Sequence, residues 1–189
     1  LKTQNSELNT LAGLSALVDQ SLVQQNEGPD GEPRFWLLET IREYALERLA
    51  RSGEEPAMRE RHARYFLALA EQAEPELTGA RQGEWLDRLE REHDNLRATL
   101  AWALGAGQSE LAARTASAIW RFWATRGYLS EGRQWPSQIL LHDAAISPAS
   151  RAKLLHAAGG LALWQNDYGA ARSYFDQSGV PAGLCRWLN

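Results

Sequence analysis

The side chains with the most versatile chemistry in this sequence are its four histidines and its only cysteine: His62, His93, His142, His156 and Cys185. None of the histidines forms an HExxH motif or another close metal-ligand spacing with a second His or Cys. Arg186 adjoins Cys185, but no histidine stands near that thiol in sequence to activate it. We therefore predict no metal site, no catalytic residue and no enzyme activity in this chain.

Acidic pairs and phosphate-binding loops add no further chemical site. Carboxylates placed like Glu90 and Asp94 are typical of solvated helix faces rather than of a general acid and its base. A GxxxxGK[ST] loop, whose backbone and lysine would bind nucleotide phosphates, does not occur. We therefore expect no cofactor, and neither binding nor hydrolysis of ATP.

The composition is that of an ordinary globular protein. The chain has 189 residues, 44% hydrophobic and 23% charged, and its net charge of -4 gives no general attraction to nucleic acid or to an anionic membrane. The single cysteine excludes an intrachain disulfide, and no apolar run approaches the roughly 20 residues that span a bilayer. We expect a cytoplasmic chain with no membrane partner. Most of its eight tryptophans lie in helical patterns, so we expect them to anchor the core between helices.

The clearest helical periodicity lies in residues 84–104, EWLDRLEREHDNLRATLAWAL. Large side chains recur there at three- and four-residue spacing: Trp85, Leu86, Leu89, His93, Leu96, Leu100 and Leu104. We predict one helix of roughly 30 Å that buries this stripe, with Arg97 and Asp94 on a solvated face. His93 interrupts the stripe, and we interpret it as a core imidazole that bonds to a neighbouring carboxylate or carbonyl.

The first 37 residues predict a helix followed by a β-hairpin. Leu8, Leu11 and Leu14 lie on one face of a helix over residues 7–18, and residues 22–37 form two short extended segments around a Gly/Pro-rich turn. A helix and then a hairpin is the second half of a winged helix. Because the segment ELNTLAGLSALVD contains no Arg or Lys, we expect no direct nucleic-acid binding and a role in interdomain contact.

Helical patterns fill most of the remaining chain. We expect helices over residues 38–52, 55–74, from 109 and over 129–141, with Gly53 as a left-handed stop, Pro75 as an end and Pro136 as a kink. The fold class is therefore all-α with one small β-hairpin: a partial winged helix followed by an α-solenoid.

The last helical hairpin, residues 146–178, has the pattern of a tetratricopeptide repeat. Ser147 and Pro148 begin its first helix, and Asn166-Asp167 separate that helix from the second. The residues that match the repeat and would pack its two helices together are Gly159, Tyr168, Ala171 and Phe175.

Four segments in order resemble the middle of large bacterial regulators of the AfsR and LuxR-type ATPase group, within the STAND class. They are LSALVDQSLV, RFWLLETIREYALERL, EHDNLRATLAWAL and GYLSEGRQW. Such regulators place a nucleotide-binding ATPase module before a winged helix and tetratricopeptide-like repeats after it. The resemblance implies a winged-helix part over 1–37, a helical connector over 38–104 and repeat-like hairpins over 105–189. Relatives carry Met-His-Asp where this chain has Leu38, Glu39 and Thr40, so no nucleotide contact is implied here.

Two classes of function follow. In the first, which we favour, the chain is a regulatory and coupling module that binds a protein, a peptide or a small effector in a helical groove and signals to the ATPase module. In the second, it is a scaffold segment of a larger enzyme whose catalytic domain lies elsewhere. The apolar residues Val180, Leu184, Trp187 and Leu188 follow the last repeat, so we also expect this segment to fold back or to mediate self-association.

Overall fold

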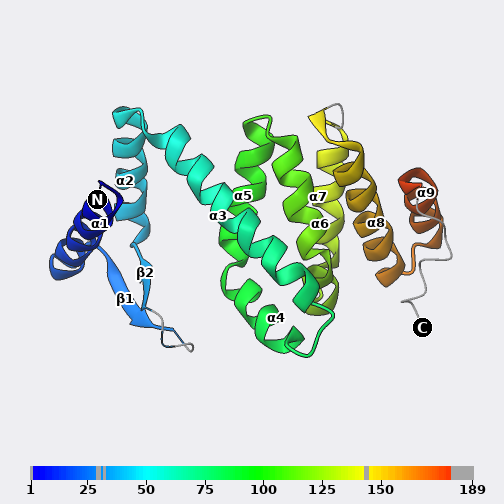
Figure 1. Cartoon of the computed structure of the whole chain (residues 1–189), viewed down its shortest axis with the longest axis horizontal. Helices are drawn as coiled ribbons and strands as arrows, with labels where there is room; N and C mark the ends of the chain where they lie inside the picture. The colour runs from blue at the N-terminus through cyan, green and yellow to red at the C-terminus, as the bar shows by residue number, and fades with distance from the viewer. Residues whose placement is uncertain (1, 29–30, 32, 143–144, 180–189) are drawn as a thin grey trace. The chain divides into compact units, whose positions relative to one another are not determined.

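The computed structural model describes the backbone of residues 2–28, 31, 33–142 and 145–179, and the side chains of these ranges from residue 10 onwards. The chain divides into two compact units, Leu1–Ala57 and Met58–Asn189. Helices make up most of the described part of both units, and the only strands found there form one antiparallel pair (Figure 1). This confirms the predicted all-α class with one small β-hairpin.

The first unit consists of helix α1 (Lys2–Asp19), strands β1 (Gln24–Glu27) and β2 (Pro33–Trp36), and helix α2 (Glu39–Ser52). The strands pair with Gln24 opposite Trp36, and the Trp36 indole Nε1 donates a hydrogen bond of 2.6 Å to Gln24 Oε1. Gly53 ends α2 at a φ of 77°, where a side chain would be strained. The predicted hairpin and the predicted glycine stop are both confirmed.

The second unit begins in helix α3 (Glu55–Glu76), which crosses the division between the units. Pro75 does not end this helix as we predicted, because α3 continues through it to Glu76. A proline in the last turn removes only one backbone donor, so the helix tolerates it there.

The single long helix predicted over residues 84–104 is wrong. The structure has α4 (Gln82–Arg91) and α5 (His93–Gly105), separated at Glu92, whose backbone (φ -100°, ψ 7°) leaves the helical region. The predicted apolar stripe is nevertheless buried through Trp85, Leu86, Leu89, His93, Leu96 and Leu100. His93, the first residue after the break, places its ring against those of Phe122 and Tyr128.

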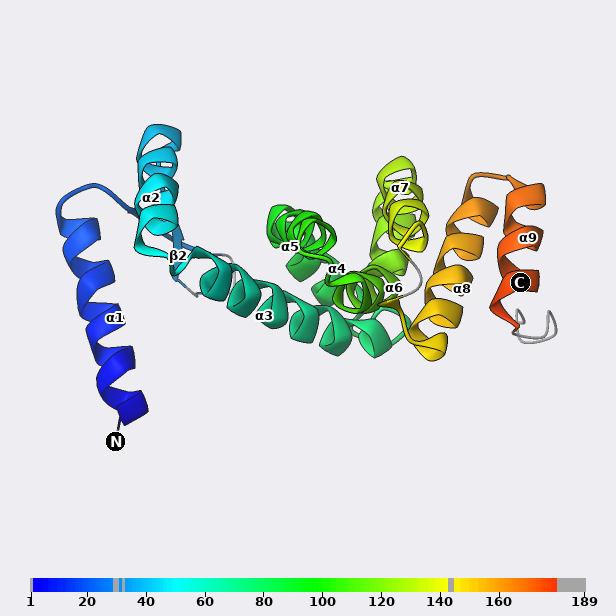
Figure 2. The ribbon, with the colours of Figure 1, turned by 90° about the horizontal axis from the view of Figure 1, so that it is seen from above.

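Four further helices complete the described part of this unit: α6 (Ser109–Arg126), α7 (Leu129–Leu140), α8 (Pro148–Trp164) and α9 (Tyr168–Ser178). They form two consecutive helical hairpins, α6 with α7 and α8 with α9, and α8 lies beside α9 in both views (Figures 1 and 2). The hydroxyl of Ser147 accepts a hydrogen bond of 3.2 Å from the Ser150 amide, which confirms the predicted start of α8. Pro136 lies inside α7, which continues past it.

The core of the second unit runs through α3 to α8. Its largest fully buried side chains are Leu77, Leu89, Leu96, Leu100, Ile119, Phe122, Trp123, Ile139, Leu154, Leu155 and Leu161. Only part of the tryptophan prediction holds, since Trp85, Trp120 and Trp123 are buried whereas Trp36 and Trp164 are exposed.

None of the described helices is long and apolar enough to cross a membrane. The predicted contacts of Val180, Leu184, Trp187 and Leu188, and Cys185 itself, lie outside the described residues.

Candidate functional site

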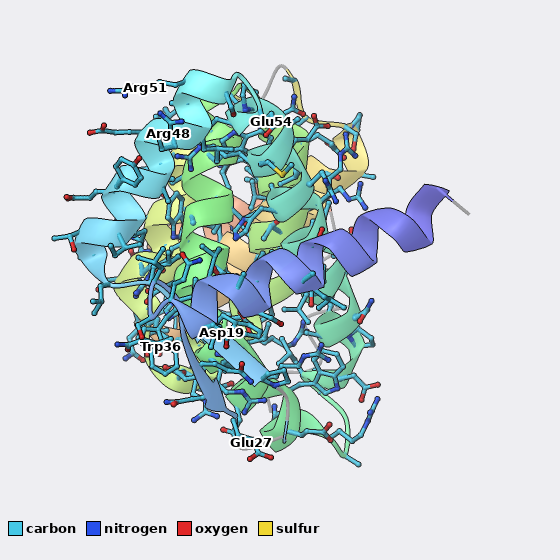
Figure 3. The ribbon with its side chains drawn as sticks, turned by 90° about the vertical axis from the view of Figure 1, so that its left-hand side faces the viewer. Asp19, Glu27, Trp36, Arg48, Arg51 and Glu54 are labelled. Carbon is cyan, nitrogen blue, oxygen red and sulfur yellow. The ribbon has the colours of Figure 1, made fainter. Side chains whose placement is uncertain are left out.

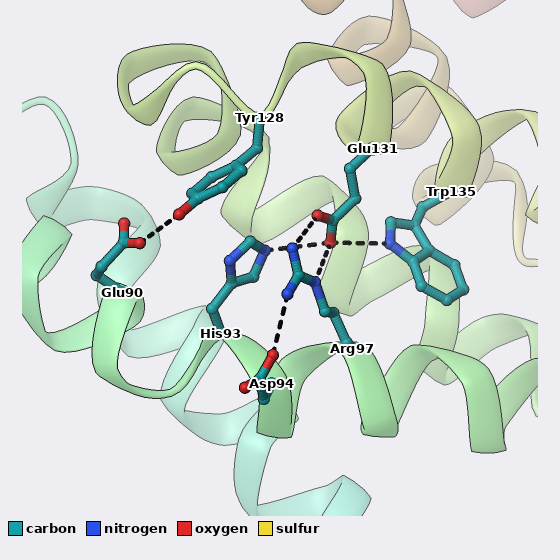
Figure 4. Close-up of polar contacts among 7 residues, drawn as sticks. All are labelled: Glu90, His93, Asp94, Arg97, Tyr128, Glu131 and Trp135. Carbon is teal, nitrogen blue, oxygen red and sulfur yellow. Dashed lines mark hydrogen bonds and ion pairs between the residues drawn. The ribbon is translucent and has the colours of Figure 1, made fainter.

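The carboxylate of Glu131, in the first turn of α7, is the centre of the largest polar network in the described residues (Figure 4). Arg97 of α5 donates two hydrogen bonds to this carboxylate, from Nε to Oε1 at 2.9 Å and from Nη2 to Oε2 at 2.6 Å. Nε2 of His93 lies 3.1 Å from Oε1, and the Trp135 indole donates to the same oxygen at 3.4 Å. One carboxylate thus connects α5 with α7.

Aromatic rings and a second carboxylate surround this network. The His93 ring lies 5.1 Å from that of Phe122 and 4.3 Å from that of Tyr128, and the Tyr128 hydroxyl donates to Glu90 of α4. The interpretation of His93 as a core imidazole bonded to a carboxylate is confirmed. Arg97, which we expected on a solvated face, instead bridges Glu131 to Asp94, at 2.9 Å from its Oδ1.

The charges in this network stabilise one another. Burial by itself would raise the pKa of Glu131, but the hydrogen bond from Arg97 and the attraction of His93 and Arg97 lower it below its usual value. The hydrogen bond to Glu131 in turn raises the pKa of the Arg97 guanidinium. A carboxylate whose oxygens already accept from three side chains is poorly suited to act as a general base, so the network fixes helix positions.

A groove of ≈ 560 Å³ adjoins the network between α5 and α7. Its walls are Arg97, Ala98, Ala101, Ser130, Glu131, Gln134 and Trp135. Small alanines on one wall and the Trp135 indole on the other give it a mainly apolar lining. In the described part of the chain no group of three or more His, Cys, Asp or Glu side chains is placed to hold a metal ion.

Sequence reasoning missed Glu131 as a site residue. A signal was present, because Tyr128, Glu131 and Trp135 stand three and four residues apart and so share one face of α7. An acidic residue between two aromatic residues on an inward face requires a buried partner.

The four residues predicted to pack the last hairpin separate into two groups. Gly159 of α8 lies directly beneath the Phe175 ring of α9, since a Cβ at Gly159 would come within 2.7 Å of that ring. Ala171 is buried, whereas Tyr168 is 67% exposed and donates a hydrogen bond of 3.3 Å to its neighbour Asn166. Gly159 and Phe175 therefore meet between α8 and α9, and a packing role for Ala171 and Tyr168 in this hairpin stays a prediction.

The first unit presents charged side chains of both signs (Figure 3). Arg48 and Arg51 extend from the exposed surface of α2, Asp19 lies at the end of α1, Glu27 lies on the hairpin and Glu54 follows α2. Arg51 lies 3.5 Å from Glu47, and Arg42 lies 2.5 Å from Glu39. These ion pairs are exposed, so each contributes little stability.

Comparison with known proteins defines the class of the first unit. Residues 1–50 match the family described as "Winged helix-turn-helix domain". The helix, the hairpin and α2 of the structure agree with that match.

Two mycobacterial proteins are similar to most of the chain: Mb0914c of Mycobacterium bovis and Rv0890c of Mycobacterium tuberculosis, each named "Putative HTH-type transcriptional regulator". Each is 38% identical over 160 residues, which cover 82% of this chain. The chain spans only 18% of the length of these relatives. No solved structure matches the chain.

These comparisons overturn the prediction that the chain has no direct nucleic-acid binding. The winged helix-turn-helix match and the regulators similar to the chain point to DNA. The prediction was wrong because it rested on the net charge of the chain and on the lack of Arg and Lys in residues 7–18. A helix-turn-helix domain also contacts the DNA backbone through its other helices and loops, and α2 carries Arg42, Arg48 and Arg51.

Proposed function

We propose that this chain is a non-catalytic regulatory segment of a larger transcriptional regulator. In this proposal the winged helix-turn-helix unit contacts DNA, and the helical unit binds a protein, a peptide or a small effector and couples that binding to regulation. The observation that carries the proposal is the match of residues 1–50 to the winged helix-turn-helix family, together with the two similar regulators.

The DNA contact is assigned to the arginines of α2. Arg48 forms no hydrogen bond or ion pair with any residue that the structure describes, so its guanidinium is free to meet a phosphate. Arg42 and Arg51 would exchange their exposed partners Glu39 and Glu47 for phosphates at small cost. Residues 1–57 hold ten acidic against five basic side chains, so we expect few phosphate contacts and modest affinity.

Fluorescence anisotropy with a labelled mixed-sequence DNA duplex, repeated over a range of salt concentrations, tests this assignment. About three phosphate contacts would give a slope of log K against log salt concentration of about -3. Replacing Arg48 and Arg51 by alanine would reduce the magnitude of this slope by about 1 to 2. The matched control is Arg172→Ala, which removes an exposed arginine of α9 and should leave the affinity unchanged. Equal binding by the double variant, or a salt-independent signal, would overturn the assignment.

The effector role is assigned to the groove between α5 and α7. Its mainly apolar lining, with Arg97 and Glu131 at one side, suits a small ligand with one polar group. A thermal-shift screen of small molecules, repeated with Ala101→Trp to fill the groove, tests this role. Hits that stabilise the filled variant equally would refute it.

We further propose that the parent protein carries an ATPase module of the AfsR and LuxR-type STAND class outside this chain, and that this chain relays its state. The support is the order of the four resembling segments and the much greater length of the two relatives. A phosphate-binding GxxxxGK[ST] loop upstream in the same gene would agree with this proposal. A gene without such a loop would refute it.

A further inference from the structure

Arg121 of α6 is a half-buried cation that forms no hydrogen bond with any residue that the structure describes. Its guanidinium carbon lies 4.4 Å from the centroid of the Trp120 ring, and the side chain forms no hydrogen bond or ion pair within the part of the chain that the structure describes. The side chain is of intermediate exposure, so part of it reaches solvent while the Trp120 ring lies against the guanidinium. A guanidinium held in this way is already oriented before a ligand arrives.

The other cations nearby are already neutralised. Arg114, two turns earlier on α6, bonds to Glu71 of α3 at 2.6 Å. Lys153 of α8 lies 2.5 Å from Glu74 of the same helix α3. Glu74 acts on Arg121 only through longer-range electrostatic attraction. Among the described residues of this surface, Arg121 therefore has no ion-pair partner, whereas its neighbours Arg114 and Lys153 each have one.

Aromatic side chains extend from Arg121 across the next two helices. The Trp120 ring lies against Gly160 of α8, where a Cβ would come within 2.7 Å of it. The His156 ring stands 6.3 Å from that of Trp120 and 5.5 Å from that of Phe175 on α9. His156 and Phe175 are both partly exposed, so an apolar group can rest on them.

We propose that Arg121, held by the buried Trp120 ring, and the partly exposed His156 form a docking site for an acidic peptide segment of a protein partner. The carboxylate of an Asp or Glu in the peptide would accept two hydrogen bonds from the Arg121 guanidinium. A neighbouring apolar residue of the peptide would lie on His156 and Phe175. Bidentate pairing with a carboxylate is the geometry for which the planar guanidinium is best suited.

Charge complementarity favours a single carboxylate over a nucleic acid. A phosphate backbone needs several cations in a row, and here Arg114 and Lys153 are held by Glu71 and Glu74. With those two cations paired, Arg121 is left to bind one carboxylate, which Glu74 affects only as a more distant charge. This inference rests on the proposed protein-binding role of the helical unit and gives that role a partner chemistry.

The neighbouring histidine supplies an internal reporter. Burial, and then the positive charge of Arg121, lower the pKa of His156. A carboxylate bound to Arg121 would offset that positive charge, so the pKa of His156 should rise on binding. A merely structural role for Arg121 would not produce this change.

The test is a selection of capped random peptides on the full 189-residue chain, repeated with Arg121→Gln. We expect peptides enriched in Asp or Glu beside an apolar residue, and about tenfold weaker binding of the best peptide to Arg121→Gln. The control Arg172→Gln on α9 should bind as the unchanged chain does. NMR titration of His156 with the selected peptide should show its raised pKa.

Peptides without acidic enrichment, or equal binding by Arg121→Gln, would overturn the docking site. The same preparations are tested for DNA binding, which Arg121→Gln should leave unchanged. If DNA binds but no acidic peptide is selected, this inference alone is refuted. If an acidic peptide binds but DNA does not, only the DNA contact of the first unit is refuted.

Discussion

Arg97 of α5 and Glu131 of α7 form a two-point ion pair, with nitrogen-to-oxygen distances of 2.9 and 2.6 Å, between elements separated by the whole of α6. The Glu131 side chain is 20% exposed and that of Arg97 is 42% exposed, so the pair joins α7 to α5 with its carboxylate mostly buried and its guanidinium partly in water. The adjoining groove takes part of its wall from each partner.

Removing the arginine should therefore destabilise the helical unit. Arg97→Ala leaves a mostly buried carboxylate without its main donor, and we expect a loss of about 1 to 2 kcal/mol in the free energy of unfolding. The control is Asp94→Asn, one turn earlier on the same helix, because the Asp94 side chain is 94% exposed. Urea denaturation followed by tryptophan fluorescence measures both, and equal losses would mean that the Glu131 pair contributes nothing specific.

The same pair predicts a pH dependence. The folded-state pKa of Glu131 is lowered from 4.5, so its contribution to stability is present above that value and is lost as the pH falls through the folded-state pKa. Glu131→Gln should therefore be less stable at neutral pH, and its stability should fall less steeply below 4.5 than that of the unchanged chain. Urea midpoints across the acidic range measure the difference, and parallel pH profiles would contradict it.

A third prediction concerns the core of α5. Leu96 is completely buried, so Leu96→Ala should cost about 2 to 5 kcal/mol. Leu141→Ala makes the same chemical change at a side chain that is 81% exposed, and should alter stability by about 0.5 kcal/mol or less. Thermal and urea denaturation of the two variants would decide the matter, because similar losses would show that α5 is not central to the core.

Two glycines should respond with opposite signs to the same added methyl group. Gly160→Ala would bring a Cβ to 2.7 Å from the buried Trp120 ring and should cost about 1 to 3 kcal/mol. Gly83→Ala, in the first turn of α4 with nothing within 4 Å, should stabilise by about 0.4 to 1 kcal/mol through reduced chain entropy. A neutral result at Gly160 in calorimetry would mean that Trp120 moves aside without cost.

The sequence by itself determined the class of fold and the position of nearly every element. The helices over α6, α8 and α9, the hairpin at residues 24–36 and the stop at Gly53 follow from periodicity and turn chemistry, which act over a few residues. The buried stripe from Trp85 to Leu100 was likewise predictable, because burial follows spacing along a helix.

Only the tertiary structure decided which polar residues matter. The bonds of Arg97 and His93 to Glu131 join residues more than 25 positions apart in the sequence. The sequence does not show whether a polar side chain will be solvated or paired. A buried charge needs a partner because it loses its water, and that loss occurs only when the helices pack together.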